Sequence, residues 1–399
     1  MKGFPVPVTA RVPRQEWDRA PWNRWSFQHV REIVPTVAVP RTDDGVWKLA
    51  EHPRDLSAIA FASSVASGSP SPLTVEQWLQ SSFTDGFIVL HRGDVVFERY
   101  MNQMNAATLH LSQSMAKSVV ASMAGILMAR GLLDAGEQVT AYLPELGDTA
   151  WQGATLQQVM DMTTGVRYVE DYEALDSDIA VTDVACGWKL PSADYRGPHC
   201  IWDQILTIKT RERAHGALFQ YRSIETDVMA HCMERVTRTP LAELISRELW
   251  QPLGCEQSAC FTVDSAGYAL ADGGFNATLR DYARFGQMHL QRGFANERQI
   301  VPADWIADIV NADPSLFGAP YTDGTPDGAY HNQFWIEDVN EKAYMARGVF
   351  GQLIYIDPAH QMVAVKLSSW PEFTSVPRLR EMLNALHAIA DYLENTNEQ

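Results

Sequence analysis

The chain is poor in cysteine and has no CxxC pair, with five cysteines among 399 residues. Such an odd and sparse set is typical of reduced thiols, so we expect no disulfide framework. Long apolar runs are also missing. The longest largely apolar stretch, Val119 to Met128, is too short to cross a bilayer, and residues 1–14 lack the apolar segment of a signal peptide. These absences predict a cytoplasmic protein with no membrane partner.

Basic residues are scarce as well: 32 lysines and arginines face 49 acidic residues, for a net charge of −17. This balance disfavours nucleic acid as a partner and mildly favours neutral or cationic ligands. The sequence contains no P-loop, GxGxxG, HExxH or GxSxG motif, and its 11 histidines show no metal-ligand spacing. We therefore expect neither a metal site nor an organic cofactor.

Strand-like patterns lie toward both ends of the chain and helical patterns fill its middle. β-Branched and aromatic runs at 86–90 and 95–100 predict a hairpin. Further strand-like runs are 333–337, 343–347, 353–357 and 362–367. Helical patterns cover 114–131, 155–162, 201–210, 224–235, 241–250, 278–291 and 376–393. We expect an α/β fold in which residues 1–104 and 272–399 form an antiparallel sheet flanked by helices, with an inserted all-helical domain at 105–271.

The segment Ser114-Met115-Ala116-Lys117 carries the strongest chemical signal. It begins a helix that is apolar on almost every face, which is typical of a buried central helix. Serine and lysine three residues apart share a helix face, so the amine can reach the hydroxyl. We expect burial to favour the neutral amine, which could then act as the base for the serine. The unpaired N–H groups of the first helical turn would favour a developing oxyanion.

A second candidate is Tyr221-Arg222-Ser223, just before the helical pattern at 224–235. A tyrosine near the serine and lysine could relay protons to a leaving group. Tyr100-Met101-Asn102 and Tyr330-His331-Asn332 share the pattern, but only Tyr221 lies at a loop-to-helix turn within the helical region. Ser223 has two readings, as part of the site or as a helix N-cap.

Taken in order, these segments resemble the serine β-lactamase and DD-peptidase superfamily. The closer resemblance is to its class C-like branch, and there to the 6-aminohexanoate-dimer hydrolases (nylon-oligomer hydrolases) and related carboxylesterases. It extends from about residue 24 to the C-terminal helix. The stretches that carry it are LSQSMAKS at 111–118, GGFNAT at 273–278, DYARFG at 281–286 and GVFGQ at 348–352.

The resemblance implies a β-lactamase-like fold with Ser114 as the acylated nucleophile, Lys117 as its base and Tyr221 as the third catalytic residue. It also implies an oxyanion hole made by the backbone N–H groups of Ser114 and Val349. Gly348 agrees with this assignment, because glycine lets a strand approach a substrate closely.

One departure from the family concerns the Lys/His-Thr-Gly triplet, which is Ala346-Arg347-Gly348 here and keeps only the glycine. In the family, the cation and hydroxyl of this triplet hold the carboxylate of β-lactams and peptidoglycan stems. We therefore expect weak or absent hydrolysis of β-lactams.

Substrate-binding residues are expected from positions relative to the motifs. Tyr172, Asp183, Trp188 and Asn276 match residues that line the acyl-amide pocket of the nylon-oligomer hydrolases. Trp188 could equally belong to the core. Residues 170–183 carry six carboxylates and are expected to form an acidic loop, which either holds a substrate ammonium or is simply solvated.

The sequence thus predicts a serine hydrolase that cleaves short-chain esters or linear amides, such as 6-aminohexanoate dimers, through an acyl-enzyme. A β-lactamase or DD-peptidase is the alternative enzyme. A catalytically silent penicillin-binding-like sensor is the alternative of another class. The expected partner is a small ester or amide; the oligomeric state is left open, with a homodimer as one option.

Overall fold

The main sheet of the computed structural model joins strands from both ends of the chain. The structure describes residues 3–43, 45–63 and 72–396. Seven antiparallel strands follow the order β11-β12-β13-β14-β15-β4-β5. They are β4 (Thr84–His91), β5 (Asp94–Tyr100), β11 (Ala329–His331), β12 (Phe334–Ile336), β13 (Tyr344–Gly348), β14 (Gln352–Asp357) and β15 (Met362–Ser368). The predicted N-terminal hairpin and C-terminal strands therefore form one sheet, joined where β15 pairs with β4.

A smaller sheet has four strands in the order β1-β7-β8-β6. They are β1 (Thr36–Val39), β6 (His110–Leu111), β7 (Ala259–Thr262) and β8 (Phe275–Ala277). Because β6 and β7 lie within 105–271, the expectation that this segment is wholly helical is wrong, and its division as a separate domain stays a prediction. Two-stranded pairs complete the strands: β2 (Ala60–Ala62) with β3 (Pro72–Thr74), and β9 (Phe294–Ala295) with β10 (Arg298–Gln299).

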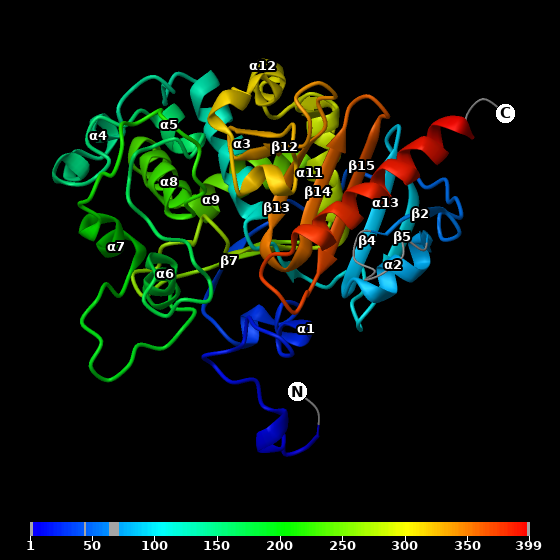
Figure 1. Ribbon diagram of the computed structural model, residues 1–399, viewed down its shortest axis with the longest axis horizontal. Coiled ribbons are helices and arrows are strands. Elements are labelled where there is room, and N and C mark those ends of the chain that lie inside the picture. The colour runs from blue at the N-terminus through cyan, green and yellow to red at the C-terminus, as the bar shows by residue number, and fades with distance from the viewer. Residues whose placement is uncertain (1–2, 44, 64–71, 397–399) are drawn as a thin grey trace.

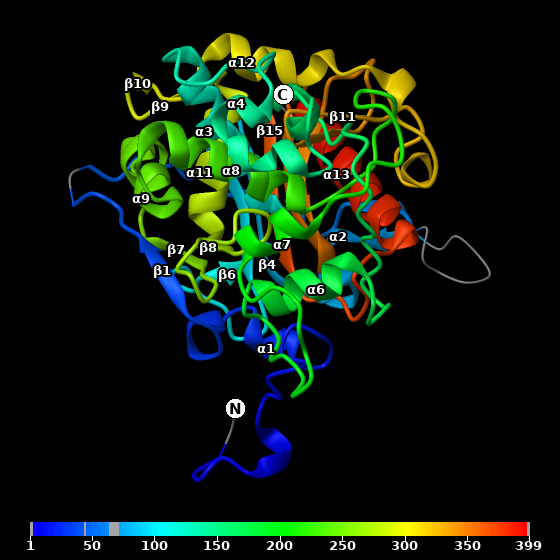
Figure 2. The same ribbon diagram turned by 90° about the vertical axis from the view of Figure 1, so that its left-hand side faces the viewer.

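Helices cover both faces of the main sheet and fill the region beside it (Figure 1). The α-helices are α1 (Asn23–Ser26), α2 (Val75–Ser81), α3 (Met115–Ala129), α4 (Val139–Tyr142), α5 (Leu156–Met160), α6 (Asp178–Ala185), α7 (Ile201–Thr207), α8 (Ile224–Thr237), α9 (Leu241–Ile245), α10 (Gln251–Leu253), α11 (Leu279–Leu290), α12 (Ala303–Asp308) and α13 (Val376–Asn395). The short helices are η1 (Val8–Ala10), η2 (Val30–Glu32), η3 (Pro144–Asp148), η4 (Ser246–Trp250, a π-helical turn), η5 (Ile309–Asn311), η6 (Pro314–Leu316), η7 (Tyr321–Asp323) and η8 (Val349–Gly351). In Figure 2 the main sheet is seen nearly edge-on between α11 and α13.

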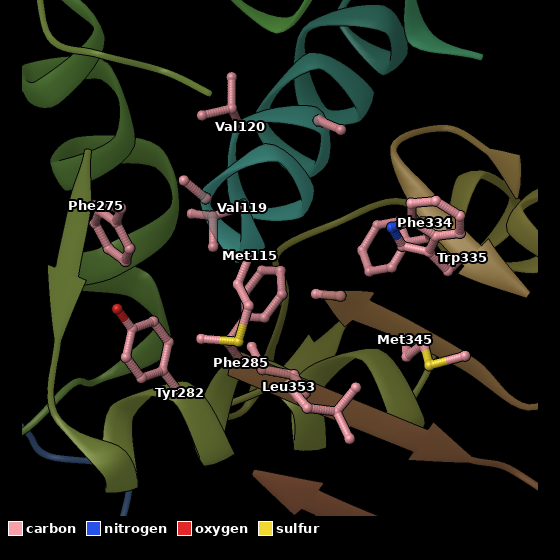
Figure 3. Packing of buried hydrophobic residues seen from close by; sticks show 14 of the residues in the cluster. Met115, Val119, Val120, Phe275, Tyr282, Phe285, Phe334, Trp335, Met345 and Leu353 are labelled. Carbon is pink, nitrogen blue, oxygen red and sulfur yellow. The ribbon is translucent and has the colours of Figure 1, made fainter. Parts of the chain in front are cut away.

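Helix α3 lies between the main sheet and the helices of the middle segment. Every residue from Met115 to Leu127 is buried, as expected for a helix that is apolar on all faces. Figure 3 shows Met115, Phe285 of α11 and Leu353 of β14 grouped below the first turn of α3. The N-terminus of α3, where Ser114 lies, is thus anchored by the core.

Part of the predicted acidic loop is helical, because residues 178–185 form α6. Ser177 starts this helix, and its hydroxyl accepts a hydrogen bond from the Ala180 N–H at 3.3 Å. The expectation of a loop over all of 170–183 is therefore wrong for its second half. Helix α6 gives Asp183 a fixed position near the helix C-terminus.

Candidate active site

Ser114 and Lys117 lie together at the N-terminus of α3. Ser114 is the N-cap residue, and the Lys117 Nζ donates to its Oγ at 3.0 Å. The same amine donates to the Asp272 carbonyl at 2.6 Å. The Lys117 side chain is almost fully buried, at 2% exposure. The spacing of three residues therefore does bring the Lys117 amine to the Ser114 hydroxyl.

The backbone N–H groups around Ser114 differ from the sequence expectation. The amides of Met115, Ala116 and Lys117 donate to the carbonyls three residues earlier, at 3.3, 3.0 and 3.1 Å, so they are not unpaired. Among the described residues, the N–H of Ser114 itself has no hydrogen-bond acceptor. Gln113, directly before it, has a positive φ of 49°. Strained backbone of this kind concentrates at functional sites.

The amine of Lys117 is buried, and acidic groups lie close enough to shift its pKa. Burial alone would lower its pKa, but Tyr221, Asp272 and Glu170 raise it above the ordinary value. This direction is opposite to the expectation that burial favours the neutral amine. Asp272 responds in turn: burial, aided by Glu170 and opposed by Lys117, raises the pKa of its carboxyl to about 6.

Tyr221 lies against the same amine, with the Lys117 Nζ 5.2 Å from the centre of its ring. Its hydroxyl interacts with the side chains of both Ser114 and Lys117, which lower its pKa, while burial dominates and raises it. The ring stacks on Trp335 at 5.4 Å, and the Tyr221 N–H donates to the Tyr321 hydroxyl at 2.9 Å. The structure therefore brings the three predicted catalytic residues together.

Glu170 connects this centre to the start of α8. Its carboxylate accepts hydrogen bonds from the N–H and the hydroxyl of Ser223, each at 2.6 Å, and from the Tyr172 hydroxyl at 2.5 Å. Ser223 is the N-cap residue of α8 but its side chain makes no capping bond. Of the two readings of Ser223, the structure thus supports participation in the site.

Val349 lies in a tight turn between β13 and β14 that is built for close approach. A Cβ added to Gly348 would lie 2.6 Å from the Ser112 carbonyl oxygen, so only glycine fits beside the segment that leads to Ser114. Phe350 follows with a φ of 63°. The Gln352 amide donates to the Phe350 and Ser368 carbonyls, at 3.3 and 2.6 Å. In the described residues the Val349 N–H, like that of Ser114, donates to no acceptor.

Two cavities meet at Ser114. The larger, of about 720 Å³, is called cavity A here, and the smaller, of about 400 Å³, cavity B. Both are lined by Ser114, Tyr172, Val349 and Phe373. Cavity A is acidic, since five carboxylates but only Arg19 and Lys189 line it; these carboxylates are Glu16, Asp18, Asp171, Asp183 and Asp272. Cavity B is walled mainly by aromatic and aliphatic side chains.

Three of the four predicted substrate-binding residues line cavity A or B, and the fourth borders a separate cavity. Tyr172 lines both cavities, and Asp183 and Trp188 line cavity A. Trp188 is also part of the core, and its Nε1 donates to the Thr262 hydroxyl at 3.0 Å, so its two readings are compatible. Asn276 is different. It lies in β8, donates to the Gly274 carbonyl and borders a separate cavity, away from Ser114.

Burial and the nearby Asp18 raise the pKa of the Asp183 carboxyl to about 7, against the opposing charges of Lys189 and Arg19. Lys189 is already paired with Asp18. Asp183 is thus a carboxyl group on a cavity wall whose charge a cationic ligand would stabilise.

Sequence reasoning missed three residues of the site. Glu170 was only one of six carboxylates in its segment, Asp272 contributes a backbone carbonyl that no side-chain pattern shows, and Arg347 lines cavity B.

No group of three or more His, Cys, Asp or Glu that could hold a metal ion occurs in the described part of the chain. No helix there is long and apolar enough to cross a membrane.

A serine with a lysine and a tyrosine at its hydroxyl, at the end of a buried helix beside an antiparallel sheet, is an arrangement suited to acyl transfer by a serine nucleophile. The chain matches the beta-lactamase family over residues 80–389 and belongs to that family. Within it, the chain is a hydrolase of the amidase and esterase type.

Several relatives are similar over most of their length. The 6-aminohexanoate-dimer hydrolase of Paenarthrobacter ureafaciens is 31% identical over 376 residues, which cover 92% of this chain and 91% of the relative. The structure of a candidate 6-aminohexanoate-dimer hydrolase from Bacillus anthracis superimposes with a TM-score of 0.89 at 30% identity, covering 98% of this chain and 99% of the other. A family VIII carboxylesterase shares the fold, with a TM-score of 0.56 and 15% identity over 76% of this chain and 92% of its own.

Proposed function

We propose that this protein hydrolyses linear amides of the 6-aminohexanoate-dimer type, and short-chain esters, through an acyl-enzyme on Ser114. The observation that carries the proposal is the 3.0 Å hydrogen bond from Lys117 to Ser114 at the junction of two cavities. The similarity to 6-aminohexanoate-dimer hydrolases over nearly the whole chain supports the same substrate class.

In this proposal the Ser114 Oγ attacks the acyl carbonyl carbon, and its proton passes to the Lys117–Tyr221 pair. The carbonyl oxygen becomes an oxyanion held by the N–H groups of Ser114 and Val349. The carbon–nitrogen or carbon–oxygen bond then breaks, and Tyr221 delivers the proton to the leaving amine or alkoxide. A water molecule attacks the acyl-enzyme in the same way, which releases the carboxylic acid and returns the proton to Ser114.

Cavity A is proposed to hold the acyl part of the substrate and its terminal ammonium. Its wall carries more carboxylates than cations, and Asp183 is among them. A β-lactamase activity is disfavoured, because nitrocefin and similar β-lactams are net anions, whereas the linear dimer is a zwitterion, and the protein has a net charge of −17.

A substrate panel tests the proposal: p-nitrophenyl butyrate, the linear dimer of 6-aminohexanoate, and nitrocefin. We expect turnover of the first two, little or none of nitrocefin, and loss of all turnover in Ser114→Ala. The exposed Ser315→Ala is the matched control. Efficient nitrocefin turnover without dimer hydrolysis would assign the protein to the β-lactamases instead.

A further inference from the structure

Arg347 is a cation on the wall of cavity B. It lies in β13, next to Gly348 in the strand that leads to Val349. Its guanidinium carbon is 4.4 Å from the centre of the Trp335 ring. Among the described residues, its side chain forms no ion pair and no hydrogen bond with a protein acceptor. A guanidinium has five N–H donors, so a half-buried one that bonds to no protein group has its hydrogen-bonding capacity available.

The other charged residue on the wall of cavity B forms no ion pair with Arg347 in the described part of the chain. Glu170 lines the cavity, but its carboxylate is occupied by Ser223 and Tyr172. Burial lowers the pKa of Arg347 to about 10, opposed by Tyr221 and Tyr330, so the guanidinium stays charged at neutral pH. A half-buried charge without a partner has lost part of its hydration, and a bound anion would offset that cost.

The remaining wall of cavity B fits an aliphatic chain. Its apolar lining includes Trp335, Trp370, Phe373, Leu379 and Met382. Because Ser114 also lines this cavity, a chain that starts at the scissile bond can extend along these side chains toward Arg347. The two cavities at Ser114 therefore differ in charge: carboxylates outnumber cations on the wall of cavity A, whereas cavity B has one carboxylate, Glu170, and one guanidinium, Arg347.

We propose that Arg347 binds a terminal carboxylate on the leaving-group part of the substrate, at the end of an unbranched aliphatic chain in cavity B. The substrate class is then a zwitterionic linear amide whose ammonium end lies in cavity A and whose carboxylate end lies in cavity B. This inference rests on the proposed function and refines it, since it fixes the direction in which the chain lies across Ser114. A guanidinium recognises a carboxylate through two parallel N–H bonds, which a neutral amide end does not match.

Binding without turnover tests this inference separately from catalysis. In the Ser114→Ala protein, calorimetry compares the linear dimer of 6-aminohexanoate with the same molecule bearing a C-terminal carboxamide. We expect the carboxylate form to bind about tenfold or more tightly, as for a hydrogen bond between charged groups. Adding Arg347→Gln should bring the ratio of the two dissociation constants to about one, and Arg347→Lys should leave an intermediate ratio.

The control is Arg298→Gln on the exposed β10 strand, which removes one positive charge away from both cavities and should keep the ratio of Ser114→Ala. Equal binding of the two ligands, or a ratio that survives Arg347→Gln, would overturn the inference. Nitrocefin forms a further arm, and Arg347-dependent binding of nitrocefin but not of the linear dimer would also overturn it. In contrast, a carboxylate preference in binding without wild-type turnover would contradict the proposed function alone.

Discussion

At the scale of single residues, the site depends on how a proton is held near Ser114. The sequence spacing correctly predicts that Lys117 reaches the hydroxyl, because three residues make nearly one helical turn. The electrostatic surroundings of the amine could not be predicted, since Glu170 and Asp272 come from distant segments. Their negative charge keeps the proton on Lys117 to a higher pH than an apolar pocket would.

This electrostatics predicts an alkaline pH dependence. A base with a raised pKa is protonated at neutral pH and loses its proton only as the pH rises, so kcat/KM should increase toward the alkaline side. A profile with p-nitrophenyl butyrate from about pH 6 to about pH 10 measures this. Lys117→Arg should be nearly as inactive as Lys117→Ala, because arginine does not deprotonate. An active Lys117→Arg enzyme would show that Lys117 supplies only a positive charge and does not act as a base.

Asp183 gives a second prediction at this scale. If it pairs with a substrate ammonium, Asp183→Asn should lower kcat/KM for amino-terminated amides about tenfold or more relative to neutral esters, since a charged hydrogen bond contributes about 1.5–3 kcal/mol. The selectivity of the wild type should increase as the pH rises through about 7, where the carboxyl ionises. Measured kcat/KM ratios at two pH values test both points. An equal loss on the two substrates would give Asp183 a structural role.

At the scale of secondary structure, the regular long elements were predicted, whereas several of the short ones were not. Helix α3 and strands β4, β5, β14 and β15 show clear patterns and lie close to their predicted bounds. Strands β6 and β8, of two and three residues, have no pattern of their own and form by pairing with neighbouring strands, β6 with β8 and β8 also with β7. Helix α6 was hidden by its acidic composition, which favoured a loop.

The turn after β13 carries the prediction at the scale of elements. In Gly348→Ala, the new Cβ would lie 2.6 Å from the Ser112 carbonyl oxygen and 3.0 Å from the Gln113 Cβ, which pushes the Val349 turn away from Ser114. We expect a loss of stability on the order of 1–3 kcal/mol and a fall in kcat of about tenfold or more. Thermal unfolding and kinetics check the two effects. Gly318→Ala, where nothing lies within 4 Å of an added Cβ, should change neither.

At the scale of the whole molecule, five segments far apart in the chain meet at the site. They contribute Ser114 with Lys117, Glu170, Tyr221, Asp272 and the strand end at Gly348. The order of the motifs along the chain could be predicted from the sequence. The position of Arg347 in cavity B and the presence of two separate cavities could not. Those features depend on the packing of β13 and α13 around the site.

Burial of the Glu225 carboxyl group should make the stability of the whole protein depend on pH. Burial raises the pKa of Glu225 from 4.5 to about 7, although Arg222, Thr164 and Trp151 oppose the shift. The native state therefore keeps the Glu225 proton to a higher pH than the unfolded chain does. Between about pH 4.5 and about pH 7, the ionisation of Glu225 in the unfolded chain lowers the free energy of unfolding. The full effect, about 3 kcal/mol, is present above that range.

Denaturant unfolding at about pH 5 and about pH 8 measures this effect. The Glu225→Gln variant should be more stable, relative to the wild type, at about pH 8 than at about pH 5. The exposed Glu297→Gln should show no such change. A difference between Glu225→Gln and wild type that is independent of pH would mean that Glu225 is ionised in the native state throughout.

Locating the acyl group after reaction shows whether a covalent acyl-enzyme forms on Ser114. The enzyme is mixed with p-nitrophenyl butyrate, quenched in acid and digested, and the peptides are mapped by mass spectrometry. We expect a butyryl group on Ser114, with no acylated peptide and at least about a thousandfold lower turnover in Ser114→Ala. An acyl group on another residue, or a Ser114→Ala protein that keeps near wild-type esterase activity, would contradict this expectation.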